Sequence, residues 1–272
     1  MSAIAVRGLR KSYGALEAVR GIDFDVQRGE VFGLLGPNGA GKTTTVEILE
    51  GYRARDAGEV TVLGLDPGRR EQTLRERMGV VLQHSETWPQ VTVAETLRIY
   101  AGYYEDSRDV GEVIELVGLV EKRDARIKTL SGGQKRRLDL GLALVGNPDL
   151  VFLDEPTTGF DPQARRNAWE MIRGLRALGK TILLTTHYLD EAQQLADRVA
   201  VLRDGVIVTE GTPAELVATS RTEIRYREDG EVKVVETDEP TRAPHELTSR
   251  AVAQGRLVVE LVPREIPPDV LG

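Results

Sequence analysis

A glycine-rich stretch between an apolar run and a helix-forming run constrains this chain most. It fits the pattern G-x-x-x-x-G-K-[ST] and reads Gly36-Pro37-Asn38-Gly39-Ala40-Gly41-Lys42-Thr43. Val31–Leu35 before it is expected to form a short buried strand, and Thr43–Leu49 after it a helix that ends near Gly51. The glycines let the backbone curl with its N–H groups pointing inward, and the helix N-terminus adds its positive dipole end. This order favours a phosphate-binding loop over the alternative, an ordinary glycine-rich turn.

Two side chains of this loop have the chemistry that a nucleotide site needs. Lys42 would place a point charge between the β- and γ-phosphates, and the hydroxyl of Thr43 would ligate Mg²⁺. A nucleotide with Mg²⁺ is therefore the expected ligand. The predicted nucleotide-binding residues here are Gly36, Pro37, Asn38, Gly39, Ala40, Gly41, Lys42, Thr43 and Thr44.

Composition excludes several classes of function. At 272 residues, 40% hydrophobic and 29% charged, the chain suits one large domain with a small appendage. No apolar run is long enough to cross a bilayer, and residues 1–7 lack the apolar core of a signal peptide, so a cytoplasmic location is expected. The absence of cysteine excludes disulfides, thiolate metal sites and cysteine nucleophiles. The net charge of −7 argues against non-specific nucleic-acid binding, and no nucleic-acid partner is expected.

The order of the expected elements indicates an α/β fold. Short alternating runs in the first thirty residues predict an N-terminal antiparallel β-subdomain. Later strands alternate with helices, which predicts a parallel sheet core. Between them, residues of about 90–148 are expected to form an inserted helical subdomain, in which Thr92 with Glu95, and Ser131 with Gln134, have the spacing of capping boxes. Asp204-Gly205 between two apolar segments predicts a hairpin.

The last part of the chain has a different pattern. Two strands are expected around Asp229-Gly230, a helix over Pro244–Gln254 and a strand over Arg256–Val262. The chain is therefore predicted to consist of a main domain at 1–219 and a small C-terminal α+β accessory module at 220–272.

Three polar residues follow the apolar strands that should lie beside the phosphate loop. Asp154 ends a strand that starts at Leu150, where a carboxylate can reach Mg²⁺ through water. Glu155 would point at the γ-phosphate and orient or deprotonate the attacking water, and His187 could hydrogen-bond the same phosphate. The alternatives are a solvated acidic pair at a strand end and a structural histidine. We predict that Glu155 and His187 are catalytic and that Asp154 is a metal ligand.

Two further features lie apart from the phosphate loop. Tyr13 is in a turn where it could stack on a purine, the alternative being an incidental surface tyrosine. A second helix N-terminus with exposed N–H groups is a second anion site, formed by Ser131, Gly132, Gly133 and Gln134. Because only one loop has a lysine, we expect the two helix ends to grip one nucleotide from opposite copies, which makes two composite sites by two-fold symmetry.

In this order, the motifs resemble those of the ATP-binding cassette (ABC) ATPases over residues 3 to about 217. The phosphate loop is similar to the Walker A loop, Leu130–Gln134 to the signature motif and Leu150–Asp154 to the Walker B strand. The resemblance also assigns the Q-loop glutamine, a nucleotide and metal contact, to Gln83, the D-loop to 159–162, the switch histidine to His187 and the adenine-stacking aromatic to Tyr13. The fold it implies is the P-loop NTPase fold with a RecA-like parallel sheet. Phe160 departs from the more usual leucine and is expected to change packing at the dimer centre without removing function.

The resemblance implies a function. In this family two cassettes close head to tail around two ATP molecules, and hydrolysis lets them part and moves a membrane partner. The stretch Leu183–Ala192, with the tail, is similar to drug exporters of the daunorubicin-resistance type. It implies an ATPase that drives export of a drug or other hydrophobic compound through a separate transmembrane permease, with the chain peripheral to the cytoplasmic face of the membrane. The loop 84–92, with Trp88, would help form the groove for a permease helix, although Trp88 is equally consistent with surface packing.

Two alternatives remain open. One is a soluble ABC protein of translation or DNA repair; those relatives usually have tandem cassettes or long coiled-coil insertions, neither of which occurs in this sequence. The other makes residues 221–272 a module that inhibits or pairs the ATPases.

Overall fold

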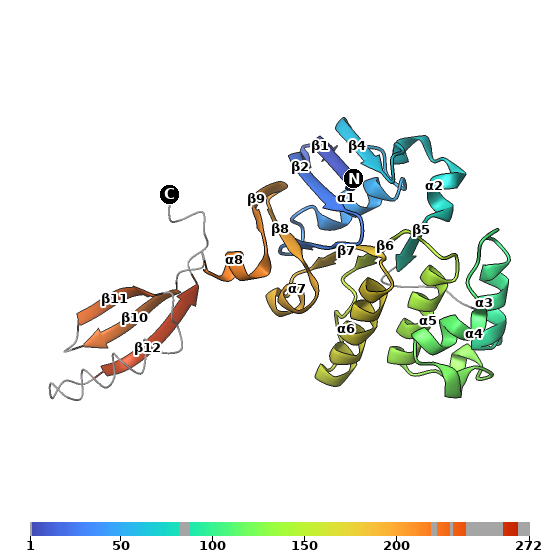
Figure 1. The fold of residues 1–272 in the computed structure, drawn as a ribbon. Helices are drawn as coiled ribbons and strands as arrows, with labels where there is room; N and C mark the ends of the chain where they lie inside the picture. Colours follow the sequence, from blue (N-terminus) through green and yellow to red (C-terminus); the bar gives the residue numbers. More distant parts are fainter. Residues whose placement is uncertain (1, 82–87, 219–221, 229–230, 238–257, 266–272) are drawn as a thin grey trace. The chain divides into compact units, whose positions relative to one another are not determined.

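The chain divides into two compact units, Met1–Glu210 and Gly211–Gly272 (Figure 1). The structure, a computed structural model, describes residues 2–81, 88–218, 222–228, 231–237 and 258–265. Each unit has its own sheets.

A three-stranded antiparallel sheet forms the start of the first unit. It has the order β2-β1-β4, with β1 at Ser2–Tyr13, β2 at Leu16–Gln27 and β4 at Ala57–Val62. In β2 the buried apolar residues Ile22, Phe24 and Val26 alternate with more accessible residues, because successive side chains of a strand point to opposite faces. The predicted antiparallel β-subdomain is confirmed, and β4 joins it from beyond the phosphate loop.

A six-stranded sheet is the centre of the first unit. Its order is β5-β6-β7-β3-β8-β9, and neighbours from β5 to β8 are parallel. The strands are β3 (Val31–Leu35), β5 (Met78–Val81), β6 (Leu150–Asp154), β7 (Thr181–Thr186), β8 (Arg198–Arg203) and β9 (Val206–Gly211). The inner strands are continuous apolar runs, as expected where both faces of a parallel sheet are covered. Because Leu35 lies opposite Thr186, and Asp154 opposite Thr185, the segments after β3, β6 and β7 emerge at one edge.

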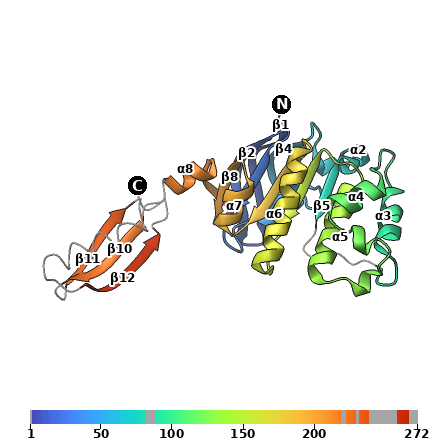
Figure 2. The ribbon, with the colours of Figure 1, turned by 60° about the horizontal axis from the view of Figure 1, so that its bottom comes forward.

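Helices cover this sheet and also form a separate block. The helices α3, α4 and α5 gather at one end of the first unit, α7 lies toward the opposite end, and α6 lies between them (Figure 2). The bounds are α1 (Lys42–Leu49), α2 (Gln72–Glu76), α3 (Val93–Ala101), α4 (Val110–Leu116), α5 (Gly132–Leu144), α6 (Pro162–Ala177) and α7 (Leu189–Leu195). Both predicted capping boxes are present, at Thr92 and Ser131. The first of these helices ends at Ala101, with Gly102 as its C-cap.

Two apolar clusters hold the unit together. In the first, the rings of Phe24 and Phe32 stack with centroids 5.5 Å apart and join the antiparallel sheet to the central sheet. In the second, Leu97 of α3 and Leu138 of α5 belong to the same buried cluster as Leu153 of β6, so the helical block and the central sheet share one core. Burial of such side chains contributes about 2 kcal/mol each.

The second unit begins with α8 (Pro213–Ala218) and contains a three-stranded antiparallel sheet. Its order is β11-β10-β12, with β10 at Thr222–Glu228, β11 at Glu231–Thr237 and β12 at Val258–Glu265. The three predicted strands are confirmed, and the predicted helix Pro244–Gln254 lies outside the described residues. Among the helices that the structure describes, none is long and apolar enough to cross a membrane.

Candidate functional site

The phosphate loop lies between the end of β3 and the start of α1, as predicted. At Gly36 a Cβ atom would lie 2.2 Å from the carbonyl oxygen of Leu202. At Gly41, where φ is 104°, a Cβ atom would lie 2.4 Å from the carbonyl oxygen of Ala18. Only glycine fits these two positions, so the path of the loop is fixed by backbone from β8 and β2 pressed against it.

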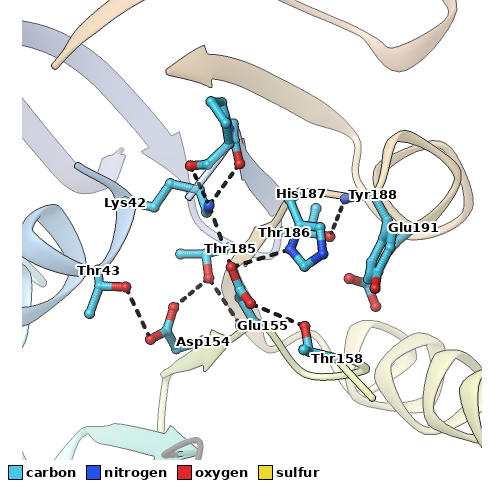
Figure 3. A network of polar contacts seen from close by, with 12 residues as sticks. Lys42, Thr43, Asp154, Glu155, Thr158, Thr185, Thr186, His187, Tyr188 and Glu191 are labelled. Atoms are coloured by element: carbon cyan, nitrogen blue, oxygen red, sulfur yellow. Dashed lines mark hydrogen bonds and ion pairs between the residues drawn. The ribbon is translucent and has the colours of Figure 1, made fainter. Parts of the chain in front are cut away.

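Lys42 is the buried cation of the site, with 4% of its side chain exposed. Its Nζ donates hydrogen bonds to the carbonyl oxygens of Gly36, at 2.7 Å, and Pro37, at 3.1 Å. The same atom lies 3.4 Å from Oε1 of Glu155 (Figure 3). Phosphate oxygens placed in the loop would compete with these acceptors for one ammonium group.

Glu155 occupies a strained position directly after β6. Its φ is 46°, in the left-handed region that few residues other than glycine adopt, and such strain is common at functional sites. Oε2 accepts a hydrogen bond from the Thr158 hydroxyl at 3.1 Å, and Oε1 lies 3.4 Å from Nδ1 of His187. Burial alone would raise the pKa of Glu155, but the Thr158 hydroxyl, the Lys42 ammonium and His187 together lower it below its ordinary value. The carboxylate is therefore ionised at neutral pH.

Asp154 lies between two threonine hydroxyls. Its Oδ1 accepts a hydrogen bond from Oγ1 of Thr185 at 2.5 Å, and its Oδ2 accepts one from Oγ1 of Thr43 at 3.5 Å. Thr185 Oγ1 also accepts the backbone N–H of Glu155 at 3.0 Å. Thr185 was not among the predicted site residues, although the parallel pairing of two strand ends could have indicated it.

The oxygens of Thr43 and Asp154 fit Mg²⁺, which prefers a few hard oxygen ligands and keeps several waters. Among the described residues there is no cluster of three or more histidine, cysteine, aspartate or glutamate side chains that could hold a metal by itself. The side chains of Thr43 and Asp154 therefore suit a metal ion that is bound partly by the protein and partly by phosphate oxygens of the nucleotide. Gln83, the third predicted metal ligand and a predicted nucleotide contact, lies outside the described residues.

Tyr13 lies at the end of β1 and borders the same open cleft as Lys42. Its hydroxyl is 3.4 Å from Oγ1 of Thr44, and the guanidinium of Arg53 lies over its ring, 5.1 Å from the centroid. With 39% of its surface exposed, the ring is accessible to a planar ligand.

The predicted second anion site is the N-terminus of α5. Ser131 and Gln134 cap each other, with backbone-to-side-chain bonds of 3.0 and 3.3 Å. No atom lies within 4 Å of a Cβ built on Gly132 or Gly133, so the backbone at this helix end is open. The two glycines border the cleft that contains Lys42, yet within the described part of the chain no hydrogen bond or ion pair joins Ser131–Gln134 to the phosphate loop.

A second groove lies between the central sheet and the helical block. It is bordered by Glu50 at the end of α1 and by the aromatic side chains of Tyr52, Tyr100 and Tyr104. Burial raises the pKa of Glu50 to about 8, with smaller contributions from the charges of Asp154 and Glu47. Glu50 was not among the predicted site residues, because neither its burial nor its distance from Asp154 can be inferred from the local sequence pattern.

We expect Glu50→Gln to change the pH dependence of stability. Between about pH 4.5, the ordinary value, and about 8, the folded chain holds a proton that the unfolded chain has released, so the free energy of unfolding falls as pH rises through this window. The neutral amide should remove that loss and stabilise the protein at pH 9 by about 5 kcal/mol. Urea unfolding from pH 5 to 9 measures this, with exposed Glu121→Gln as the control. Parallel profiles for wild type and Glu50→Gln would contradict the assignment.

Comparison with known proteins agrees with this geometry. The family model described as ABC transporter matches residues 19–158. The chain is 47% identical over 223 residues to the Nod factor export ATP-binding protein I of Paraburkholderia xenovorans (strain LB400), covering 80% of this chain and 73% of that protein. It is also 47% identical over 220 residues to the protein of the same name from Rhizobium sp. (strain N33), covering 79% and 72%.

Solved structures show the same fold. The structure of cbiO1 from Clostridium perfringens, described as part of the ABC transporter complex cbiONQ, superposes with a TM-score of 0.72 and 28% identity, over 80% of this chain and 91% of that one. An ATP-binding subunit of an ABC transporter superposes with a TM-score of 0.71 and 27% identity, over 79% and 92%. The predicted P-loop NTPase fold is confirmed. This chain belongs to the ABC transporter family and is an ATP-hydrolysing, ATP-binding subunit of that family.

Proposed function

We propose that the chain is the Mg²⁺-dependent ATPase subunit of an exporter and that Glu155 and His187 are its catalytic residues. One observation carries the proposal: Nζ of Lys42 and Nδ1 of His187 each lie 3.4 Å from the same carboxylate oxygen of Glu155. Three separate segments of the chain thus place a cation, a base and an imidazole at one point beside a phosphate loop. Phosphoryl transfer depends on this kind of positioned charge.

Each residue has a role that follows from its contacts. Lys42 binds the β- and γ-phosphates in place of its loop carbonyls, and Thr43 and Asp154 hold the metal. When bound, Mg²⁺ neutralises charge on the phosphate oxygens. Glu155 accepts the proton of the attacking water, and its strained backbone fixes the direction of its carboxylate. His187 donates a hydrogen bond to the γ-phosphate, and its Nδ1 is buried without a hydrogen-bond partner among the described residues.

A second copy of the chain completes the site in this proposal. The open backbone of Gly132 and Gly133 is suited to bind phosphate oxygens, and Ser131 and Gln134 fix the helix end that presents them. The phosphate loop of one copy then faces Ser131–Gln134 of the other, and two ATP molecules are enclosed by head-to-tail closure. A solved relative with 22% identity, described as the dimeric structure of an ATP-binding cassette bound to ADP and Pi, has the same fold.

We propose a separate transmembrane permease as the partner, with the chain peripheral to the cytoplasmic face of the membrane. The groove beside Glu50, Tyr100 and Tyr104 receives a cytoplasmic helix of that permease, and Trp88 is proposed as a further contact. Trp88 is 53% exposed, as a contact residue must be. The relatives named for Nod factor export support export as the direction.

For the cargo we propose a drug or other hydrophobic compound. This class rests on the resemblance of Leu183–Ala192 to exporters of the daunorubicin-resistance type. The names of the matched relatives support export and do not support this cargo. We further propose that residues 1–219 act as the ATPase and 220–272 as a small accessory module.

Co-expression with a membrane protein from a neighbouring gene tests the proposal. We expect the two to purify together, and inside-out vesicles that contain both to accumulate a fluorescent hydrophobic drug when MgATP is added. A complex that forms but moves no such drug would overturn the cargo class alone. Purification with ribosomes and never with a membrane protein would overturn the transport role. Vesicles with the permease alone are the control.

A further inference from the structure

A buried carboxylate outside the proposed catalytic set joins three segments of the first unit. Glu191 is on α7, shortly after His187, and only 1% of it is exposed (Figure 3). Its Oε1 accepts hydrogen bonds from the hydroxyl of Thr157, at 2.7 Å, and from Nε1 of Trp169, at 3.1 Å. Burying a carboxylate is costly unless it is bonded, so these two donors fix where the side chain lies.

The first donor belongs to the turn that contains Glu155. Thr157 is 0% exposed. The backbone N–H of Thr158 donates to the carbonyl oxygen of Glu155 at 3.3 Å, and that of Phe160 to the carbonyl oxygen of Thr157 at 3.1 Å. Glu155 is at the strained φ of 46°, which persists only where surrounding contacts hold it. A hydrogen bond from Thr157 is therefore well placed to hold the Glu155 backbone.

The second donor, Trp169, and its neighbours on α6 contact α7 and the residues just before it. Trp169 is on α6, and Arg165, on the same helix, lies 4.7 Å from the ring centroid of Tyr188 and 3.5 Å from a carboxylate oxygen of Asp190. The ring of Tyr188 in turn lies 4.0 Å from that of His187. The segment that contains His187 is thus anchored to α6 on one side and to the Glu155 turn on the other.

We infer that Glu191 is a positioning residue that sets the place of Glu155 relative to His187, through its hydrogen bond with Thr157. The inference rests on the proposed catalytic roles of Glu155 and His187. Glu155 follows β6 and His187 follows β7, and their side chains lie 3.4 Å apart. Oε1 of Glu191, on the segment after β7, accepts a hydrogen bond from Thr157, on the segment after β6. Loss of this bond lets the turn and α7 shift relative to each other, which misplaces the base without removing any group that contacts ATP.

Paired variants at Thr157 test the inference. Thr157→Val keeps the shape but removes the hydroxyl, and we expect kcat for ATP hydrolysis to fall by about ten- to a hundredfold, as for small misplacements at a catalytic centre. KM for ATP and the affinity for ATP should change little. Thr157→Ser restores the hydroxyl and should restore most of kcat.

Variants at Glu191 distinguish its role as a hydrogen-bond acceptor from the effect of its negative charge. Glu191→Gln keeps an oxygen that can accept both hydrogen bonds and should retain most of kcat, while Glu191→Leu should lower kcat as Thr157→Val does. Combined with Thr157→Val, Glu191→Leu should cause little further loss, because both changes remove one interaction. Arg173→Ala is the matched control, since it removes an exposed hydrogen bond between α6 and α7, from Arg173 to Gln194 at 2.9 Å.

Two results would overturn the inference. The first is full kcat in Thr157→Val. The second is a fall in kcat that is matched by equal losses of ATP affinity and of Tm, as expected from a purely structural contact. The proposed function fails separately, because turnover in Glu155→Gln would remove the role of Glu155 whatever the Thr157 and Glu191 variants do.

Discussion

Glu155→Gln is expected to lower the steady-state rate of ATP hydrolysis by about 10²- to 10⁴-fold, the range for loss of a general base. The amide keeps the shape of the side chain and can still accept the Thr158 hydroxyl, but it cannot take a proton from water. ATP binding should survive, because Lys42, Thr43 and Asp154 are unchanged. With hydrolysis blocked, the closed pair of chains should accumulate.

Phosphate release and size-exclusion chromatography in MgATP measure these two effects. We expect the Glu155→Gln variant to elute as a dimer with ATP and as a monomer without it. Glu121→Gln, at an exposed position, is the charge-matched control. Normal turnover in Glu155→Gln would remove Glu155 from the chemistry, and a monomer in ATP would count against head-to-tail closure.

Lys42→Ala should abolish useful ATP binding. Lys42 is 4% exposed and donates to two loop carbonyls, so its ammonium is held where phosphate oxygens would lie. Removing one partner of a buried, hydrogen-bonded charge pair costs several kcal/mol, which corresponds to about a hundredfold or greater loss of affinity. The change also raises the pKa of Glu155, because the Lys42 charge helps to lower it.

Titration with a fluorescent ATP analogue measures the loss, and exposed Lys122→Ala serves as the control. The folded state should persist, which circular dichroism and urea unfolding check. Retention of affinity within a few fold of wild type would show that backbone N–H groups of the loop carry the phosphate contact without Lys42.

Local sequence order predicted the part of the site that depends on local structure. Gly36–Thr43 follows a short apolar strand and begins a helix. This order of elements identifies the phosphate loop without any knowledge of tertiary contacts. Asp154, Glu155 and His187 could be selected because each follows an apolar run, and parallel strands bring their carboxyl ends together. The exposed start of α5 was visible from the spacing of Ser131 and Gln134.

The supporting contacts could not be predicted in this way. Thr185 reaches Asp154 across 31 positions of sequence, and Thr157 reaches Glu191 across 34, so their partners depend on tertiary packing. Glu50 looked like any charged residue near a helix end, and only the packed structure shows its burial. The helix α8 was missed although Thr212 and Glu215 cap its start, because its few residues gave no clear apolar period.

The placement of Gly36 and Gly41 against Leu202 and Ala18 bears on how the protein is made. The phosphate loop extends from β3, which lies between β7 and β8, two strands that the ribosome delivers only after residue 180. Until then β3 has neither neighbour, and the carbonyl of Leu202 that presses on Gly36 does not yet exist. Contacts so distant in sequence form late, because closing a long loop is costly in entropy. A nascent chain therefore becomes able to bind ATP only near the end of synthesis of the ATPase domain. A chain truncated before β8 would not bind nucleotide.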